Sequence, residues 1–250
     1  MFEVHQPIDV KLARDIGPQK RSAIIIDNFY ENPDEVRELC LRKHAEDKID
    51  SEVEGLAGTR IELEELGGVL RDRLGHLFCD LCFDTFVWGE NPDPARFFSR
   101  LEEMTFAYNI VTDKTLVDKP IGIIPHQEVY EACPSERHSH TQFGGIVFLN
   151  KPEECRGGTN LYSLDGEMTV PYLGDPKIPW ENGEEDLDNI DQFKHIRSSI
   201  DNDGHWKVEH TFEMVYNRFI LYQGKNLHAA DIDLGWFNDE TPRINQVFFL

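Results

Sequence analysis

From about Met104 onward the chain is a succession of short apolar or alternating runs separated by turn residues, and no other feature limits its fold as much. The runs cover residues 104–111, 121–126, 144–149, 159–164, 206–216, 218–223, 227–232 and 243–250. Gly, Pro, Asn and Asp stand between them, as they do between strands joined by turns. Residues 104–250 are therefore predicted to form an antiparallel barrel or sandwich.

Residues 1–103 have a different pattern, which indicates mainly helix. A short apolar strand, AIIIDNF, is followed by ENPDEVRELCLRKHAED. Asn32 can cap this helix, Pro33 suits its first position, and Asp34 lies where the helix dipole favours acid. A second helical stripe runs through residues 62–82. Since 250 residues suit one large domain, we expect a single α+β unit over 1–250, with residues 1–103 as helical support for a strand core in 104–250.

The segment 170–203 is polar and acidic, and it is long for a plain connection. It ends in a possible helix near residues 187–200. Long loops are often lids or binding elements, so we expect a lid here. Its acids would attract a cationic substrate; a solvated acidic loop is the alternative. The acids in question are Glu181, Glu184, Glu185, Asp186 and Asp188.

Charge and composition disfavour several classes of partner. With 25 Lys and Arg against 47 Asp and Glu the net charge is −22, which disfavours nucleic acid and anionic membrane surfaces. No apolar run approaches the length of about 18 residues that suggests a membrane span. The N-terminus lacks the apolar stretch of a signal peptide, so a cytoplasmic location is expected. The five cysteines are odd in number and spread out, which argues against a disulfide framework.

The strongest local signal for chemistry is the run PIGIIPHQE. In an extended chain His126 and Glu128 point to the same side, so an imidazole and a carboxylate converge. This pair is two-thirds of a metal-binding facial triad. His228, which opens the run LHAADI after a strand and a turn, fits as the third member. Two neutral imidazoles and one carboxylate suit Fe(II) and leave coordination positions open.

Arg243 opens the final run, RINQVFFL. If the last two runs form a hairpin, Arg243 lies near His228 across it. A guanidinium is well shaped to hold a carboxylate through two parallel hydrogen bonds. Period-two alternation places Asn245 on the same face as Arg243. The alternative is an arginine that only covers the end of a sheet.

These residues resemble the 2-oxoglutarate/Fe(II) dioxygenases, whose HxD/E…H triad lies on a double-stranded β-helix, a jelly-roll or cupin-like fold. The run GGIVFLNKPEECRGGTNLYS is similar to the prolyl-4-hydroxylase branch, in which a strand ends in Leu-Asn before a Gly-Gly-Thr turn. The opening IIIDNFYENPDEVRELCL is similar to an uncharacterised bacterial family of 2-oxoglutarate/Fe(II) oxygenases. In that family a Pro-Gly-x-Arg turn follows, for which GLAGTR is a loose counterpart.

The resemblance implies an oxygenase that hydroxylates an unactivated C–H of an amino acid, peptide or small metabolite. It would consume O2 and 2-oxoglutarate and release succinate and CO2. The implied catalytic Fe(II) ligands are His126, Glu128 and His228, and Arg243 is the implied anchor of 2-oxoglutarate. Further candidates for holding this co-substrate are Tyr108, Thr159, Tyr222 and Asn245. The carboxylate at position 128 favours hydroxylation, because halogenating relatives lack it.

Two alternatives belong to other classes. His138 and His140 form a second candidate metal pair, as in a cupin-type enzyme that needs no 2-oxoglutarate. No acid follows His140 at the four- or five-residue spacing that a cupin would need. The other alternative is a non-catalytic binding module on the same fold. An intact set of three ligands with Arg243 argues against the loss of a metal site.

Overall fold

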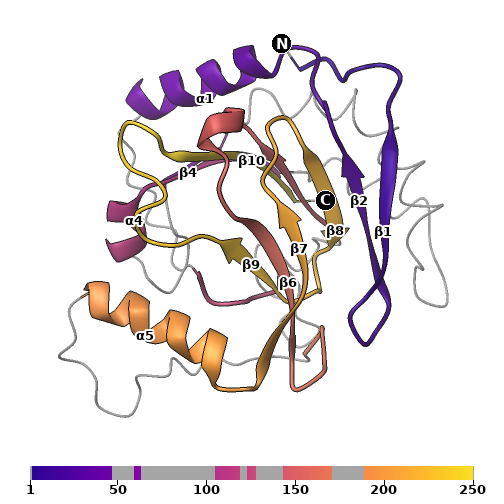
Figure 1. Cartoon of the computed structure of the whole chain (residues 1–250). Helices are drawn as coiled ribbons and strands as arrows, with labels where there is room; N and C mark the ends of the chain where they lie inside the picture. Colours follow the sequence, from indigo (N-terminus) through magenta and orange to yellow (C-terminus); the bar gives the residue numbers. More distant parts are fainter. Residues whose placement is uncertain are drawn as a thin grey trace.

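The computed structural model describes residues 2–46, 59–62, 105–118, 123–127, 143–170 and 189–249. In these ranges the chain is a mixed α/β structure with two antiparallel sheets, as Figure 1 shows. The large sheet has the order β1 (Val10–Ile16), β2 (Arg21–Ile26), β8 (Phe219–Gln223), β5 (Phe143–Phe148), β10 (Arg243–Phe249), β4 (Thr105–Val111) and β3 (Thr59–Glu62). The small sheet has the order β7 (Trp206–Glu213), β6 (Gly158–Leu164) and β9 (His228–Asp231).

The strands predicted after Met104 are confirmed, with one exception. The exception is the run 121–126, of which residues 123–127 are described and contain an isolated bridge at His126 instead of a regular strand. Pro125 accounts for this difference, because proline cannot donate to a strand ladder. The helical elements are α1 (Pro33–Glu46), α4 (Asp113–Asp118), α5 (Asn189–Asn202) and the 3-10 turn η3 (Pro152–Glu154). No helix within the described ranges is long and apolar enough to cross a membrane.

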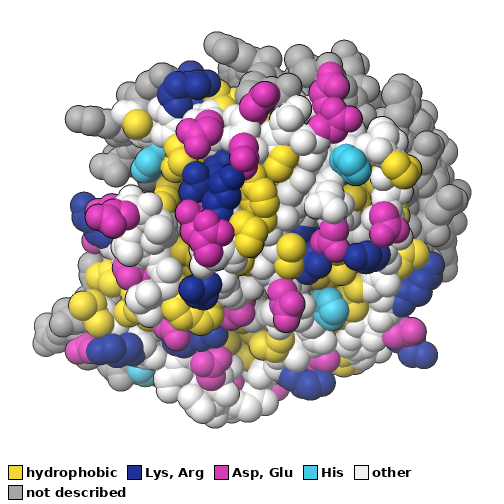
Figure 2. Space-filling view, turned by 45° about the horizontal axis from the view of Figure 1, so that its top comes forward, with side chains coloured by type: hydrophobic (Ala, Val, Ile, Leu, Met, Phe, Trp, Pro, Cys, Tyr) yellow, Lys and Arg dark blue, Asp and Glu magenta, His cyan; other side chains and the backbone are white. Residues whose placement is uncertain are grey.

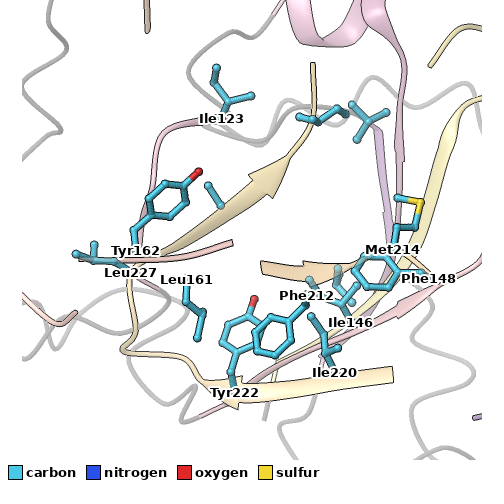
Figure 3. Packing of buried hydrophobic residues seen from close by; sticks show 14 of the residues in the cluster. Ile123, Ile146, Phe148, Leu161, Tyr162, Phe212, Met214, Ile220, Tyr222 and Leu227 are labelled. Atoms are coloured by element: carbon cyan, nitrogen blue, oxygen red, sulfur yellow. The ribbon is translucent and has the colours of Figure 1, made fainter. Parts of the chain in front are cut away.

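Alternation along the strands divides the large sheet between two hydrophobic clusters. On the outer face the apolar side chains pack beneath α1, and on the inner face they meet the small sheet. The outer cluster includes Ile24, Val36, Cys40, Leu221, Ile244 and Phe248. The inner cluster includes Ala23, Ile146, Leu161, Phe212, Ile220, Tyr222 and Val247, several of which are drawn in Figure 3. The two sheets therefore enclose a shared core, and the candidate site is built at its edge.

Helix α5 covers the other face of the small sheet. Its residues Phe193, Ile196 and Ile200 are buried and belong to the inner cluster. Arg197 forms an ion pair with Asp231 at 3.4 Å. The helix expected near residues 187–200 is thus confirmed as a packed element. Residues 189–202 of the lid expected over 170–203 form α5, and α5 is part of the core, so these residues do not form a lid. The remaining residues, 171–188, lie outside the described part of the chain.

The N-terminal region contributes sheet as well as helix. Strand β2 and helix α1 form where the pattern predicted them. Strand β1 was not predicted; it pairs with β2 and extends the large sheet beyond β8. Of its residues only Ile16 is buried, so its sequence carries little of the apolar signal that marks a strand. The helical stripe expected at 62–82, with Cys79 and Cys82, lies outside the described residues apart from Glu62, which ends β3.

Candidate active site

The structure brings His126 and His228 together from distant parts of the chain. Their backbones form an antiparallel bridge in which each N–H donates to the other's C=O at 2.9 Å. The centroids of the two imidazole rings are 4.6 Å apart. His228 is buried at the start of β9, whereas His126 is half-buried. Two imidazoles held this close by main-chain hydrogen bonds can bind the same metal ion.

Both imidazoles are oriented in the same way by the chain itself. Nδ1 of His126 lies 3.1 Å from the carbonyl oxygen of Ile124, and Nδ1 of His228 lies 2.8 Å from that of Asn226. A carbonyl oxygen only accepts hydrogen bonds, so both Nδ1 atoms carry the proton. In the neutral rings the lone pair is then on Nε2. This is the arrangement that fixes the tautomer of a metal-binding histidine.

The other expected metal ligands cannot be placed. Glu128, His138 and His140 lie outside the described residues. Within the described ranges, no group of three His, Cys, Asp or Glu side chains gathers around one point. The geometry therefore brings together two candidate nitrogen ligands, and the sequence has Glu128 two residues after one of them.

Arg243 is buried between the two sheets. Its guanidinium donates from Nη2 to the carbonyl of Gly158 at 2.8 Å and from Nη1 to that of Asp231 at 3.3 Å. Burial lowers the pKa of Arg243 to about 10, against the opposing influence of Asp231 and Tyr222. Among the described residues no carboxylate forms an ion pair with it. A buried cation whose hydrogen bonds all go to neutral groups can attract an anionic ligand.

The expected hairpin between the last two runs does not form. Strand β9 pairs with β6 in the small sheet, and β10 pairs with β4 and β5 in the large one. Both edges of β10 are already occupied, so β9 cannot lie beside it. Arg243 reaches the small sheet by crossing the space between the sheets, where it meets the backbone at Gly158 and Asp231.

Amide and hydroxyl side chains occupy strand positions next to the groups that bind this guanidinium. Asn245 lies on the same face of β10, as alternation predicts, and its Oδ1 accepts a hydrogen bond from Arg243 Nε at 3.0 Å. Asn109 is paired with Asn245 in register, and its Oδ1 is buried without a partner. Oγ1 of Thr159 is likewise buried without a partner, and Thr159 follows Gly158. Asn109 was not predicted, although in FAYNI it alternates with Tyr108 and so had to face the opposite side.

Tyr222 lies beside the histidine pair. The centroid of its ring is 4.8 Å from that of His228, and the ring is also stacked with that of Phe212, with centroids 6.4 Å apart. Figure 3 shows Tyr222, Phe212 and Leu161 pointing into the same space. A Cβ at Gly144 would lie 3.1 Å from the Tyr222 ring, so glycine at this position gives the ring its room. Tyr222 thus forms a wall of the site.

The structure does not bring Tyr108 to the site. Tyr108 belongs to the cluster beneath α1, on the outer face of the large sheet, and burial raises its pKa. It is paired in register with Gln246, which accepts a hydrogen bond from the Tyr30 hydroxyl at 2.6 Å. Arg243 and Asn245 lie on the opposite face. Tyr108 is therefore a residue of the outer core.

No family model matches the chain, and no curated protein matches it. Among solved structures, a prolyl 4-hydroxylase from Phytophthora capsici is similar with 11% identity and a TM-score of 0.47 over 91% of this chain, which spans 57% of that protein's length. A prolyl-4-hydroxylase from Pseudomonas putida has 11% identity and a TM-score of 0.41, with 97% of this chain and 92% of that one covered. An N-substituted L-amino acid dioxygenase from Burkholderia ambifaria has 12% identity and a TM-score of 0.37, with 99% and 95% covered.

Proposed function

We propose that the chain is a 2-oxoglutarate- and Fe(II)-dependent oxygenase that hydroxylates an unactivated C–H of an amino acid, peptide or small metabolite. One observation carries the proposal. His126 and His228 lie side by side, and each donates its Nδ1 proton to the carbonyl two residues earlier. Both Nε2 atoms are thereby prepared to bind a metal ion. An ordinary pair of core histidines has no need of matched tautomers.

The donor set fits Fe(II). Two imidazole nitrogens with the carboxylate of Glu128, two residues after His126 in the sequence, would make up the facial set typical of non-haem Fe(II) oxygenases. In this proposal the three side chains would hold the ion, which would also bind the co-substrates 2-oxoglutarate and O2.

The positive end of the site fits a dicarboxylic acid. Arg243 would hold the distal carboxylate of 2-oxoglutarate, because the guanidinium is buried and all its hydrogen bonds among the described residues go to neutral groups. Asn245 orients Nε of Arg243. Thr159 in the small sheet and Asn109 in the large sheet each have a buried side-chain oxygen without a hydrogen-bond partner.

The protein's part in the reaction is binding, orientation and exclusion of water. His126 and His228 keep their protons on Nδ1, so neither imidazole blocks the metal with an Nε2 proton. Tyr222 and Phe212 give the site an apolar wall. Bound Fe(II) and 2-oxoglutarate would supply the oxidising chemistry, with succinate and CO2 as products. The side chains of the site would determine which C–H bond of the substrate lies next to the metal ion.

The order in which the chain visits the two sheets supports a double-stranded β-helix. Strand β4 is in the large sheet, the His126 bridge joins β9 of the small sheet, and β5 returns to the large one. Strands β6 and β7 are in the small sheet, β8 in the large, β9 in the small and β10 in the large. This alternation between facing antiparallel sheets is what a jelly-roll winding requires.

The nature of the substrate remains part of the proposal. The acids at 181–188 would favour a substrate with a cationic group, and the net charge of −22 disfavours nucleic acid and anionic membranes as partners. A cytoplasmic location would supply both 2-oxoglutarate and reduced iron.

The test is an anaerobic titration of the purified chain with Fe(II) and 2-oxoglutarate, read by the weak visible metal-to-ligand charge-transfer band of the chelate. The wild type is expected to develop the band only when both are present. His126→Ala should lose it, because one of the two ligating nitrogens is removed.

His205→Ala is the matched control. His205 is an exposed histidine whose Nδ1 pairs with Asp165 at 2.6 Å on the surface. This variant should keep the full band. A folded wild type that binds Fe(II) but shows no band with 2-oxoglutarate would contradict the proposed function.

A further inference from the structure

Arg21 opens strand β2 and lies on the inner face of the large sheet. Its partner in the β1–β2 ladder is Ile16, and both Ile16 and Ala23 belong to the cluster between the sheets. Paired residues, and residues two apart on a strand, share a face. Ala23 is in turn paired with Tyr222. Arg21 is therefore a half-buried cation on the face of the sheet that carries the wall of the candidate site.

The hydrogen bonds of Arg21 go to neutral groups. Nη2 donates to Thr169 Oγ1 at 3.1 Å, and Nη1 donates to Gln223 Oε1 at 3.4 Å. Nε is buried and has no hydrogen-bond partner. Burial lowers the pKa of Arg21, opposed by the charge of Glu167. The carboxylate of Glu167 accepts a hydrogen bond from Gln19 instead.

An arginine without an ion-pair partner is unexpected in so acidic a chain. Asp and Glu number 47 against 25 Lys and Arg, and Figure 2 shows basic side chains beside acidic ones across one face. Two other half-buried arginines follow this pattern. Arg37 binds Glu154 at 3.1 Å, and Arg218 binds Asp27 at 2.6 Å. Among the described residues Arg21 has no such acid, so its charge is available to an external anion.

The hydrogen bond from Arg21 to Thr169 connects it to the segment that carries His126. Thr169 precedes Val170, whose backbone is held at both ends by the carboxamide of Gln127. The Val170 N–H donates to Gln127 Oε1 at 2.6 Å, and Gln127 Nε2 donates to the Val170 carbonyl at 3.1 Å. Gln127 directly follows His126. The segment that Arg21 contacts is thus fixed to the segment that carries the first histidine.

The hydrogen bond from Arg21 to Gln223 connects it to the strand beside His228. Gln223 directly follows Tyr222, whose ring is 4.8 Å from that of His228. The same turn contains Asn226, which is fully buried and whose side-chain nitrogen and oxygen both lack a hydrogen-bond partner. Its carbonyl orients the His228 ring. The unsatisfied carboxamide of Asn226 therefore lies three residues after Gln223, which Arg21 contacts.

We propose that Arg21 binds a carboxylate of the substrate beside the metal site. This inference rests on the proposed function and narrows the substrate to a molecule with a free carboxylate. The two hydrogen bonds of Arg21 leave further N–H donors of the planar guanidinium unused, and a carboxylate is the anion whose two oxygens suit such a fork. An amino acid or a peptide with a free carboxyl terminus satisfies this requirement.

The test uses propionate as the probe and propionamide, which has the same shape without the charge, as its comparison. Thermal unfolding of the full chain is followed at constant ionic strength, with 2-oxoglutarate saturating, over a range of probe concentrations. Propionate should raise the melting temperature of the wild type, and propionamide should not. In Arg21→Gln the apparent Kd for propionate should rise about tenfold or more. Arg21→Lys keeps the charge without the planar fork and should fall between.

Arg156→Gln is the matched control, because Arg156 is exposed and donates to the carbonyls of Glu153 and Cys155. It should respond as the wild type does. Equal responses of the wild type and Arg21→Gln, or no response of the wild type, would overturn the carboxylate site. The charge-transfer band of the same proteins is recorded separately. A band without a propionate response contradicts only the carboxylate site, and a propionate response through Arg21 without a band contradicts only the proposed metal chemistry.

Discussion

At the scale of single residues, the buried cation of Arg243 serves ligand binding at a cost to the stability of the fold. Arg243 is 2% exposed, and its described hydrogen-bond partners are the Asn245 amide and two backbone carbonyls. A buried charge is costly unless it is well paired, so a chain selected for stability alone would place an acid beside it. The neutral amide at position 245 orients the cation without neutralising it. The positive charge thus remains available to a ligand.

Asn245→Asp tests this division of roles. Aspartate has almost the same shape, but it would place a carboxylate 3.0 Å from Arg243 Nε, where Asn245 Oδ1 lies now. The new ion pair would compete with the distal carboxylate of 2-oxoglutarate. The apparent Kd for 2-oxoglutarate, measured by the charge-transfer band, should rise about tenfold or more, which corresponds to at least about 1.4 kcal/mol.

Asn160→Asp is the control for this substitution. Asn160 and Asn245 are both 4% exposed, but the Asn160 amide donates to the Tyr162 hydroxyl on the other face of the small sheet. Its substitution should change the affinity for 2-oxoglutarate by less than about twofold. If the two variants weaken binding equally, the effect belongs to any buried carboxylate, and Arg243 is not the anchor.

At the scale of elements, helix α1 is held by ionic contacts to the turn that follows β5, in addition to its apolar packing on the large sheet. Nη2 of Arg37 binds both carboxylate oxygens of Glu154 in η3 at 3.1 Å. The two side chains are only 12% and 17% exposed. Glu154 also accepts the N–H of Lys151 at 3.0 Å. This contact fixes the turn between β5 and β6, at the end of which the chain reaches Gly158.

Glu154→Gln should lower the free energy of unfolding by about 1–3 kcal/mol, since a hydrogen-bonded and largely buried charge pair is broken on one side. Urea unfolding followed by circular dichroism measures the loss. Glu38→Gln is the matched control: Glu38 also lies beside Arg37, at 3.9 Å, but its side chain is 71% exposed. Exposed pairs contribute about 0–1 kcal/mol. Equal losses in the two variants would show that burial of the Glu154 contact adds nothing.

The elements differ in how far the sequence predicts them. Strands β5 and β8 are nearly all buried, so continuous apolar runs mark them clearly. Strand β1 pairs only with β2 at the edge of the sheet and is largely half-exposed, so its pattern is weak. The site residues on β9 and β10 were chosen from their types and positions. The pairing of these two strands was wrong, because pairing depends on distant segments that a local pattern does not contain.

The same limit explains the residues that were missed at the site. Arg21 lies far from the other site residues in sequence, and only the pairing of β2 with β8 brings it near Tyr222. Asn109 needed the register of β4 against β10 before its face could be assigned. Tyr108 was selected by residue type, and the same register places it on the outer face.

At the scale of the whole molecule, the large sheet joins the two ends of the chain. Strand β2 pairs with β8, and β10 lies between β4 and β5. The cluster beneath α1 includes Val36 and Cys40 from the helix together with Leu221 and Phe248 from the central strands. Removal of the N-terminal region would expose an apolar face of the sheet and the edge of β8. Residues 1–103 are therefore expected to be part of one folding unit with the strand core.

This expectation predicts a single unfolding transition. The four tryptophans, of which Trp206 lies on β7, report unfolding by their fluorescence, and Cys40, which is fully buried in α1, reports the outer face by its labelling with iodoacetamide. Burial raises the pKa of the Cys40 thiol, so labelling requires that α1 leave the sheet. Peptide mass spectrometry over a urea series should give Cys40 the same midpoint as the fluorescence. Labelling of Cys40 at clearly lower urea would show that α1 is a separate unit, because the strand core would then remain folded without its cover.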